Sequence, residues 1–296
     1  MQIIIDFWGD LAHIFLSNYL ILLKPLLLCL YTHSVDFRDL DIVVVSAALG
    51  HPKYFLAANR LRQQLSGFFG KNQILILDPS TLHEYCPETS NLYAEYMNEK
   101  TMGFGYWTWK SELVFSILKN HSCVLYIDVG CEFNANFFSK LTFKRLLNET
   151  KENGYLIQDT GIPERILTKK EVVKKLNVPE HHLNTSQFSA TWFLLQQTGG
   201  LNFVKEWLDL TLQGINLSDE HTTIKNATGF FAHRNDQSLF SLTAKRLQMN
   251  TSKFHPRGGE GNLNANLLGY SVPIWPSRNK SSESKIPRWF PFQYSR

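Results

Sequence analysis

The stretch Cys123–Asn134, CVLYIDVGCEFN, decides the fold class. Its first five residues favour a buried strand, which ends on Asp128 with a glycine two positions later. Similar strand-like runs occur at residues 41–49, 73–78 and 154–159, residues 189–197 form a further apolar run, and segments with helical periodicity separate most of them. Strands that alternate with helices are typical of an α/β fold. The sequence therefore predicts a mainly parallel central sheet flanked by helices.

The acidic residues after this strand have two interpretations. In parallel sheets, ligands bind at the carboxyl ends of strands, and Asp128 stands at such an end. A carboxylate there, with Glu132 close by, suits Mg²⁺ or Mn²⁺ bridging two phosphates. An aspartate followed by glycine also commonly forms a turn. Taken alone, the stretch leaves both interpretations open.

Composition excludes several classes of protein. The 296 residues carry a formal net charge of only +4 and lack a long basic run, so no nucleic-acid partner is expected. The 4 cysteines show neither CxxC pairs nor Cys/His ligand spacing, which argues against a zinc site and a disulfide framework. Phosphate-loop, GxSxG and HExxH motifs are also missing.

The N-terminal segment Leu11–Tyr31 is long and apolar enough for a helix that spans a bilayer. It also carries Lys24 and Pro25 near its middle, and its flanks show neither a charge bias nor a signal-peptide pattern. A membrane anchor, an interfacial helix and a packed helix all fit. A membrane association would lie on the cytoplasmic face or in the secretory lumen, and recurrent Asn-x-Ser/Thr sequons favour the lumen.

Two further segments combine polar and aromatic residues with possible chemistry. HRNDQS, residues 233–238, precedes an apolar helix, where one Asn or Asp would be an ordinary N-cap but five consecutive polar residues offer both an acid and a cation. GFGYWTWK, residues 103–110, has alternating tryptophans as in an extended segment, and Lys110 then opens a helix. Aromatic packing or a substrate-binding wall would explain it equally.

Three motifs in this order, GFGYWTWK, YIDVG (residues 126–130) and HRNDQS, carry a resemblance. On them, residues 41–248 resemble a poorly characterised group of glycosyltransferase-like proteins with the GT-A fold, found in polysaccharide-building contexts. The resemblance implies transfer of a sugar from a nucleoside diphosphate sugar to a hydroxyl of a glycan or other acceptor. It also implies a single GT-A-like domain at 37–254, preceded by the apolar segment 1–36 and followed by a loop-rich tail at 255–296.

The same resemblance implies roles for individual residues. A Mn²⁺ or Mg²⁺ ion would be held by Asp128, with Gly130 standing where a second acid is usual and Glu132 or His255 as further ligands. Asp236 would act as base or sugar-binding acid, with Gln237 beside it. The implied donor- and acceptor-binding residues are Lys110 at the diphosphate, Trp107, Trp109, His233, Arg234, Ser46 and Arg60.

Two other functions remain open at this point. A GT-A-like scaffold that lacks the second acid fits a non-catalytic protein that binds a nucleotide or glycan. A metal-dependent phosphohydrolase also places an aspartate after a central strand, but usually with another acid where Gly130 stands.

Overall fold

The computed structural model describes residues 37–134, 137–215, 224–252 and 273–285. Its main sheet has the strand order β2-β1-β3-β6-β5. The strands are β1 (Ile42–Ala47), β2 (Ile74–Leu77), β3 (Cys123–Ile127), β5 (Tyr155–Pro163) and β6 (Ser186–Gln196). β1 pairs in parallel with β2 and β3, while β6 pairs antiparallel with both β3 and β5. All strands but β6 thus share one direction, which confirms the mainly parallel sheet.

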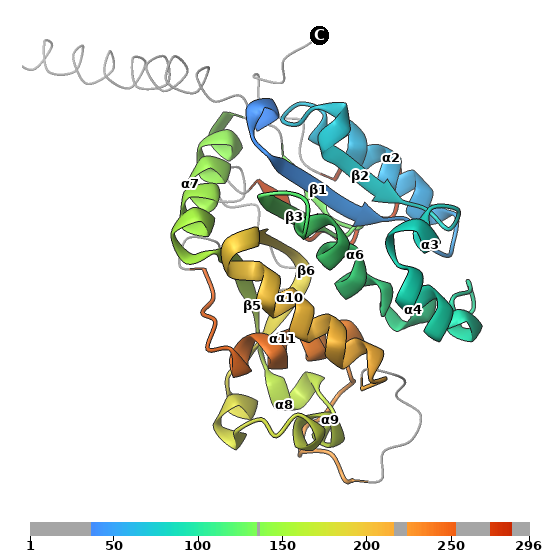
Figure 1. Ribbon diagram of the computed structural model, residues 1–296, viewed down its shortest axis with the longest axis vertical. Coiled ribbons are helices and arrows are strands. Elements are labelled where there is room, and N and C mark those ends of the chain that lie inside the picture. Colours follow the sequence, from blue (N-terminus) through green and yellow to red (C-terminus); the bar gives the residue numbers. More distant parts are fainter. Residues whose placement is uncertain (1–36, 135–136, 216–223, 253–272, 286–296) are drawn as a thin grey trace, which may run out of the picture.

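Helices cover both faces of this sheet. α6 (Trp109–Leu118), α10 (Gln197–Leu212) and α11 (Asn235–Arg246) pack on one face, and α6 runs beside α10 (Figure 1). α2 (Lys53–Leu65) and α7 (Phe137–Asn153) pack on the other. In β1, Val43 and Val45 point into the first core and Ile42 and Val44 into the second. A strand buried on both faces explains the continuous apolar run in the sequence.

Short helices fill two regions between the long elements. The segment after β2 contains α3 (Leu82–Tyr85), α4 (Pro87–Leu92) and the 3-10 turn η3 (Ala94–Tyr96). Between β5 and β6 lie α8 (Glu164–Leu167), α9 (Lys170–Lys175) and η4 (Glu180–Asn184). These pieces are too short for a helical period to show in the sequence. Two more 3-10 turns, η1 (Phe37–Asp39) and η2 (Lys71–Gln73), precede β1 and β2.

A second, two-stranded sheet joins the C-terminal region to the rest of the fold. β4 (Glu132–Phe133) pairs antiparallel with β7 (Ile274–Trp275). Residues 273–285, expected to belong to a loop-rich tail, therefore contain a strand that packs next to the turn after β3. A two-residue strand has no recognisable alternation, so its sequence does not reveal it.

Several predictions fall on residues that the structure does not describe. The apolar segment 11–31 lies outside the described residues, so its helix and its membrane association stay predictions of the sequence. His255 and the last eleven residues, 286–296, also lie outside. Within the described ranges, none of the helices has the length and hydropathy needed to cross a bilayer.

Candidate active site

Three charged side chains from different elements meet at the carboxyl end of β3. The Lys110 ammonium lies 2.7 Å from Asp236 Oδ2 and 3.3 Å from Asp128 Oδ1. It also donates to the backbone oxygen of Ala190 in β6, at 3.3 Å. Lys110 and Asp236 are buried, whereas about a third (35%) of the Asp128 side chain is exposed. The site is therefore a buried lysine beneath two acids, one of which faces solvent.

The fold explains why these residues meet. Asp128 directly follows β3, Lys110 lies in the first turn of α6, and Asp236 lies in the first turn of α11. Asp128 N–H donates to Thr191 O of the neighbouring strand β6, at 2.9 Å. Gln237, next to Asp236, accepts a 3.3 Å hydrogen bond from Ala190 N–H through Oε1. Strand β6 thus supports both the turn after β3 and the start of α11.

The turn interpretation of Asp128 describes its backbone, and the side chain makes separate contacts. Its carbonyl oxygen accepts a hydrogen bond from Cys131 N–H at 2.8 Å, so its backbone does form a turn. Its side chain is not used in that turn, because Oδ1 accepts the Tyr126 hydroxyl at 2.7 Å and contacts Lys110. Burial and the nearby Asp128 charge raise the pKa of Tyr126 well above its usual value, so Tyr126 stays a neutral donor. The carboxylate is oriented by two contacts and remains partly open.

The charges of the three residues depend on one another. Burial raises the pKa of Asp236 to about 6, against the opposing effect of Lys110. Burial lowers the pKa of Lys110, but Asp128 and Asp236 outweigh it, so the pKa of this lysine lies above its ordinary value. Lys110 is therefore positively charged at neutral pH, and Asp236 is a carboxylate that takes up a proton in mildly acidic solution. A carboxylate with this pKa suits a general base.

Asp236 does not act as the helix cap that was the alternative interpretation of HRNDQS. Helix α11 is preceded by Arg234 at the N-cap position, and no side-chain cap hydrogen bond forms there. His233 is buried, and its Nδ1 faces the N–H of Lys169 at 3.5 Å. Burial and the charge of Lys169 lower the pKa of His233 to about 3, so it is neutral at physiological pH. Arg234, the next residue, is partly exposed.

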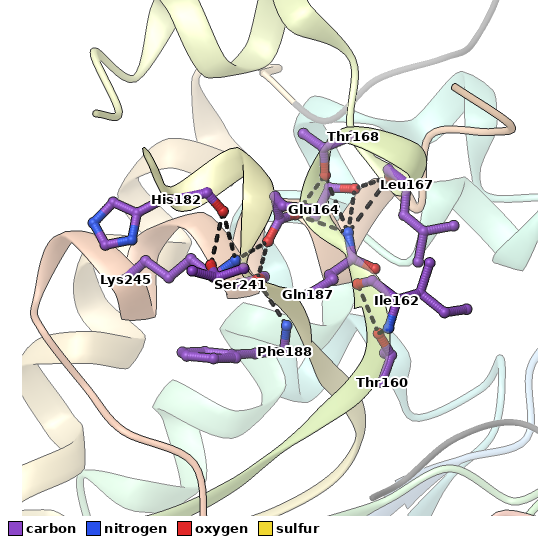
Figure 2. Close-up of polar contacts among 12 residues, drawn as sticks. Thr160, Ile162, Glu164, Leu167, Thr168, His182, Gln187, Phe188, Ser241 and Lys245 are labelled. Carbon is purple, nitrogen blue, oxygen red and sulfur yellow. Dashed lines mark hydrogen bonds and ion pairs between the residues drawn. The ribbon is translucent and has the colours of Figure 1, made fainter. Parts of the chain in front are cut away.

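A buried polar network around Glu164 and Gln187 (Figure 2) holds Gln237 in place. Gln237 Nε2 donates to Gln187 Oε1 at 2.6 Å, and Gln187 Nε2 donates to Glu164 Oε1 at 2.9 Å. Glu164 also accepts hydrogen bonds from Thr168 and Ser241 and forms a 2.6 Å ion pair with Lys245. The network joins α8, β6 and α11, so it fixes the end of α11 that carries Asp236.

The GFGYWTWK segment is not extended, which corrects the expectation from its alternating tryptophans. The five residues from Gly103 to Trp107 all have positive φ, between 52° and 89°, and form a left-handed turn, α5 (Gly103–Tyr106) plus Trp107. A Cβ on Gly103 would lie 2.2 Å from the Trp107 ring. Glycine relieves the steric cost at two positions, and the remaining strained residues make this turn a candidate for function.

The two tryptophans of this segment differ in exposure. Trp109 is 4% exposed, and its indole N–H donates to Gly103 O at 3.2 Å, so it belongs to the core. Trp107 is partly exposed and packs against the edge of that core. Of the pair, only Trp107 has exposed side-chain surface that a ligand could contact.

Three further candidates lie in contacts that hold the structure together. Ser46 is buried and donates to Ile127 O at 2.5 Å. Arg60 donates to four backbone carbonyl oxygens, two in the turn after β3 and two in the segment 279–281. Glu132 accepts hydrogen bonds from Asn279, Ser284 and the Lys285 backbone. These contacts tie Arg60 and Glu132 to the C-terminal segment and differ from the nucleotide and metal contacts that the resemblance implies.

Metal binding is constrained by the donor set. Among the described residues, no three His, Cys, Asp or Glu side chains lie close enough together to enclose a metal ion. Asp128 contributes one partly open carboxylate, and Lys110 already lies between it and Asp236. Mg²⁺ commonly binds through one or two carboxylates together with substrate phosphates and water. The residues therefore fit a cation shared with a diphosphate, and they do not form a closed protein cage.

Sequence reasoning missed several residues of this site. Tyr126 stands in the YIDVG motif, but its place in a strand indicates only core packing. Gln187 and Ala190 lie in none of the three motifs. Their contribution depends on the pairing of β6, which leaves no local signal in the sequence.

The comparisons with known proteins found structural similarity only. No family model matches the chain, and no curated protein matches its sequence. Among solved structures, mouse xyloside xylosyltransferase 1 in its apo form aligns with 11% identity and a TM-score of 0.41, covering 72% of this chain and 85% of that one. The apo structure of the WbbM bifunctional glycosyltransferase aligns with 12% identity and a TM-score of 0.44, covering 80% of this chain and 45% of that one.

Proposed function

We propose that this chain is a glycosyltransferase that moves a sugar from a nucleoside diphosphate sugar to a hydroxyl of a glycan or other acceptor. The observation that carries the proposal is the buried Lys110 between Asp128 and Asp236 at the carboxyl end of β3. Such a site supplies one open carboxylate for a cation or sugar and one buried carboxylate for a proton. Sugar transfer from a diphosphate needs both functions.

Asp236 is the proposed base that takes the proton from the acceptor hydroxyl. Its ionised form predominates at neutral pH, and Lys110 stabilises that form from 2.7 Å away. Lys110 itself is 2% exposed and contacts three oxygen atoms, so its role is to orient the two acids. Direct contact of Lys110 with the diphosphate, implied by the resemblance, is not part of this proposal.

Asp128 is the proposed protein ligand for Mn²⁺ or Mg²⁺. When bound, the cation would stabilise the negative charge that grows on the leaving nucleoside diphosphate. Asp128 holds its carboxylate in position through Tyr126 and Lys110, with the rest of the side chain directed toward solvent. Trp107 and Arg234, both partly exposed, complete the proposed donor-binding rim.

Nucleotide binding tests this function directly. We expect one of UDP, GDP, CDP, TDP or ADP to raise the melting temperature, and to do so more strongly with Mn²⁺. Ligand at about 100 Kd contributes about 2.7 kcal/mol, which is readily measured. In Asp128→Asn, the Mn²⁺-dependent part of the shift should disappear. Binding without release of nucleoside diphosphate from any donor sugar would instead favour the non-catalytic binding protein.

The pH dependence of the reaction follows from Asp236. The base must be ionised, and its pKa is raised to about 6, so kcat/KM should rise with pH through about 6 and level off above that. Steady-state kinetics at constant ionic strength with the identified donor measures this profile. A carboxylate with a raised pKa titrates between about pH 5 and about pH 8. A kcat/KM that stays constant over this range would show that Asp236 is not the base.

A further inference from the structure

Tyr126 contacts both members of the ion pair between Lys110 and Asp128. Its hydroxyl donates to Asp128 Oδ1 at 2.7 Å, and the Lys110 ammonium lies 4.9 Å from the centroid of its ring. A hydrogen bond to a carboxylate is stronger than one between two neutral groups. Because Tyr126 is 1% exposed, its ring is shielded from bulk water. One buried side chain thus contacts the acid and the base of the pair.

Strand pairing fixes the place of this hydroxyl. Tyr126 stands opposite Phe193 in the antiparallel pair of β3 and β6, and the two rings stack with centroids 5.1 Å apart and planes 17° apart. Residues two apart in a strand lie on the same face of the sheet. The contact between the strands continues to Asp128, whose N–H donates to Thr191 O at 2.9 Å. Tyr126 and Asp128 therefore share one face, and the hydroxyl reaches the carboxylate.

The two oxygen atoms of the Asp128 carboxylate have different surroundings. Oδ1 accepts the Tyr126 hydroxyl and lies 3.3 Å from the Lys110 ammonium. Within the part of the chain that the structure describes, Oδ2 receives no hydrogen bond. Since 35% of the side chain is exposed, a ligand has access to it. Oδ2 is therefore the oxygen that remains for a ligand.

We propose that Tyr126 is a positioning residue that holds Oδ1 of Asp128 and thereby presents Oδ2 as the oxygen that binds the divalent cation. This inference rests on the proposed function and names the ligand atom within it. Hydrogen bonds from a second layer of residues commonly orient metal-ligating carboxylates. Without the hydroxyl, the carboxylate would turn more freely about its terminal bond, because such bonds have broad rotational preferences. Either oxygen would then pair with Lys110, and Oδ2 would lose its fixed orientation.

Water-proton relaxation tests this inference, because Mn²⁺ bound to a slowly tumbling protein relaxes water more strongly than free Mn²⁺. The full chain is titrated with Mn²⁺ alone and with Mn²⁺ plus each of UDP, GDP, CDP, TDP and ADP. Tyr126→Phe should weaken Mn²⁺ binding by about tenfold or more, the usual cost of losing a hydrogen bond that orients a metal ligand. Phenylalanine keeps the ring stack on Phe193, so the fold should be retained, which circular dichroism checks.

The matched control is Tyr93→Phe, which removes the same atom from another buried tyrosine. Tyr93 is 4% exposed, and its hydroxyl donates to the backbone oxygen of Thr211. This variant should lose stability as Tyr126→Phe does, but its Mn²⁺ affinity should change less than about twofold, as for independent sites. A second control combines Tyr126→Phe with Asp128→Asn. Because Tyr126 acts through the Asp128 carboxylate, the double variant should give the same Mn²⁺ titration as Asp128→Asn alone.

The outcomes separate this inference from the proposed function. Equal Mn²⁺ affinities of Tyr126→Phe and Tyr93→Phe, or no Mn²⁺ binding to the wild type in any of the titrations, would overturn the positioning role. Mn²⁺ binding that depends on the Tyr126 hydroxyl, without turnover of any donor sugar, would support the positioning role and count against the transferase. Donor turnover with an unchanged Mn²⁺ affinity in Tyr126→Phe would support the transferase and overturn the positioning role.

Discussion

Replacement of Asp236 by asparagine is expected to lower kcat by about 10²- to 10⁴-fold, the usual contribution of a general base. Asparagine has almost the same shape but does not accept the proton of the acceptor hydroxyl. The side chain is buried against Lys110, so the substitution removes a charge with little change in packing. Release of nucleoside diphosphate with saturating donor and acceptor measures the effect.

Two controls distinguish lost chemistry from lost structure. Asp209→Asn changes an exposed acid of α10 that pairs with Lys205, and it should leave kcat unchanged. Nucleotide-dependent stabilisation should persist in Asp236→Asn, because the proposed donor contacts lie at Asp128, Trp107 and Arg234. The rise of kcat/KM through pH 6 should also vanish with the carboxylate whose pKa is about 6. A fall in melting temperature that accompanies the loss of activity would point to a structural role instead.

The sequence predicts the framework of this site well and its contacts poorly. Strand β3 is visible as an apolar run ending on Asp128, and the rule that ligands bind at carboxyl ends of strands identifies Asp128 as a candidate. The motifs GFGYWTWK and HRNDQS contain Lys110 and Asp236, respectively. Their ion pair, however, depends on the packing of α6 and α11 beside β6, and no local sequence pattern predicts that packing.

One wrong prediction and one set of unforeseen contacts illustrate this limit. Alternating aromatic residues suggested an extended segment at Gly103–Trp107, but the glycines permit positive φ and the chain forms a left-handed turn. The resemblance implied a place by the nucleotide for Arg60 and a metal-ligand role for Glu132. In the structure, both side chains also contact the segment 279–285, which reaches them through β7 and the contact with Gly130. Periodicity and motif spacing do not reveal such long-range contacts.

Replacement of Lys245 by methionine is expected to lower the free energy of unfolding by about 3–5 kcal/mol, because it leaves the Glu164 charge buried without its cation. Lys245 and Glu164 are 2% and 0% exposed and lie 2.6 Å apart. The control is Lys205→Met, in which an exposed i,i+4 pair with Asp209 is lost, and it should cost less than about 0.5 kcal/mol. Urea unfolding followed by circular dichroism gives both values.

The double variant Glu164→Gln/Lys245→Met shows whether the cost comes from the unpaired charge. Glutamine is neutral and still offers an oxygen to Thr168 and Ser241, so the double variant should recover much of the lost stability. The single variant Lys245→Met should also have lower activity. Its Glu164 loses a partner, and Glu164 accepts the hydrogen bond of Gln187, which in turn contacts Gln237. Equal stability of the single and double variants would mean that Lys245 contributes through packing against Phe188, which its ammonium approaches to 5.2 Å, and not through its charge.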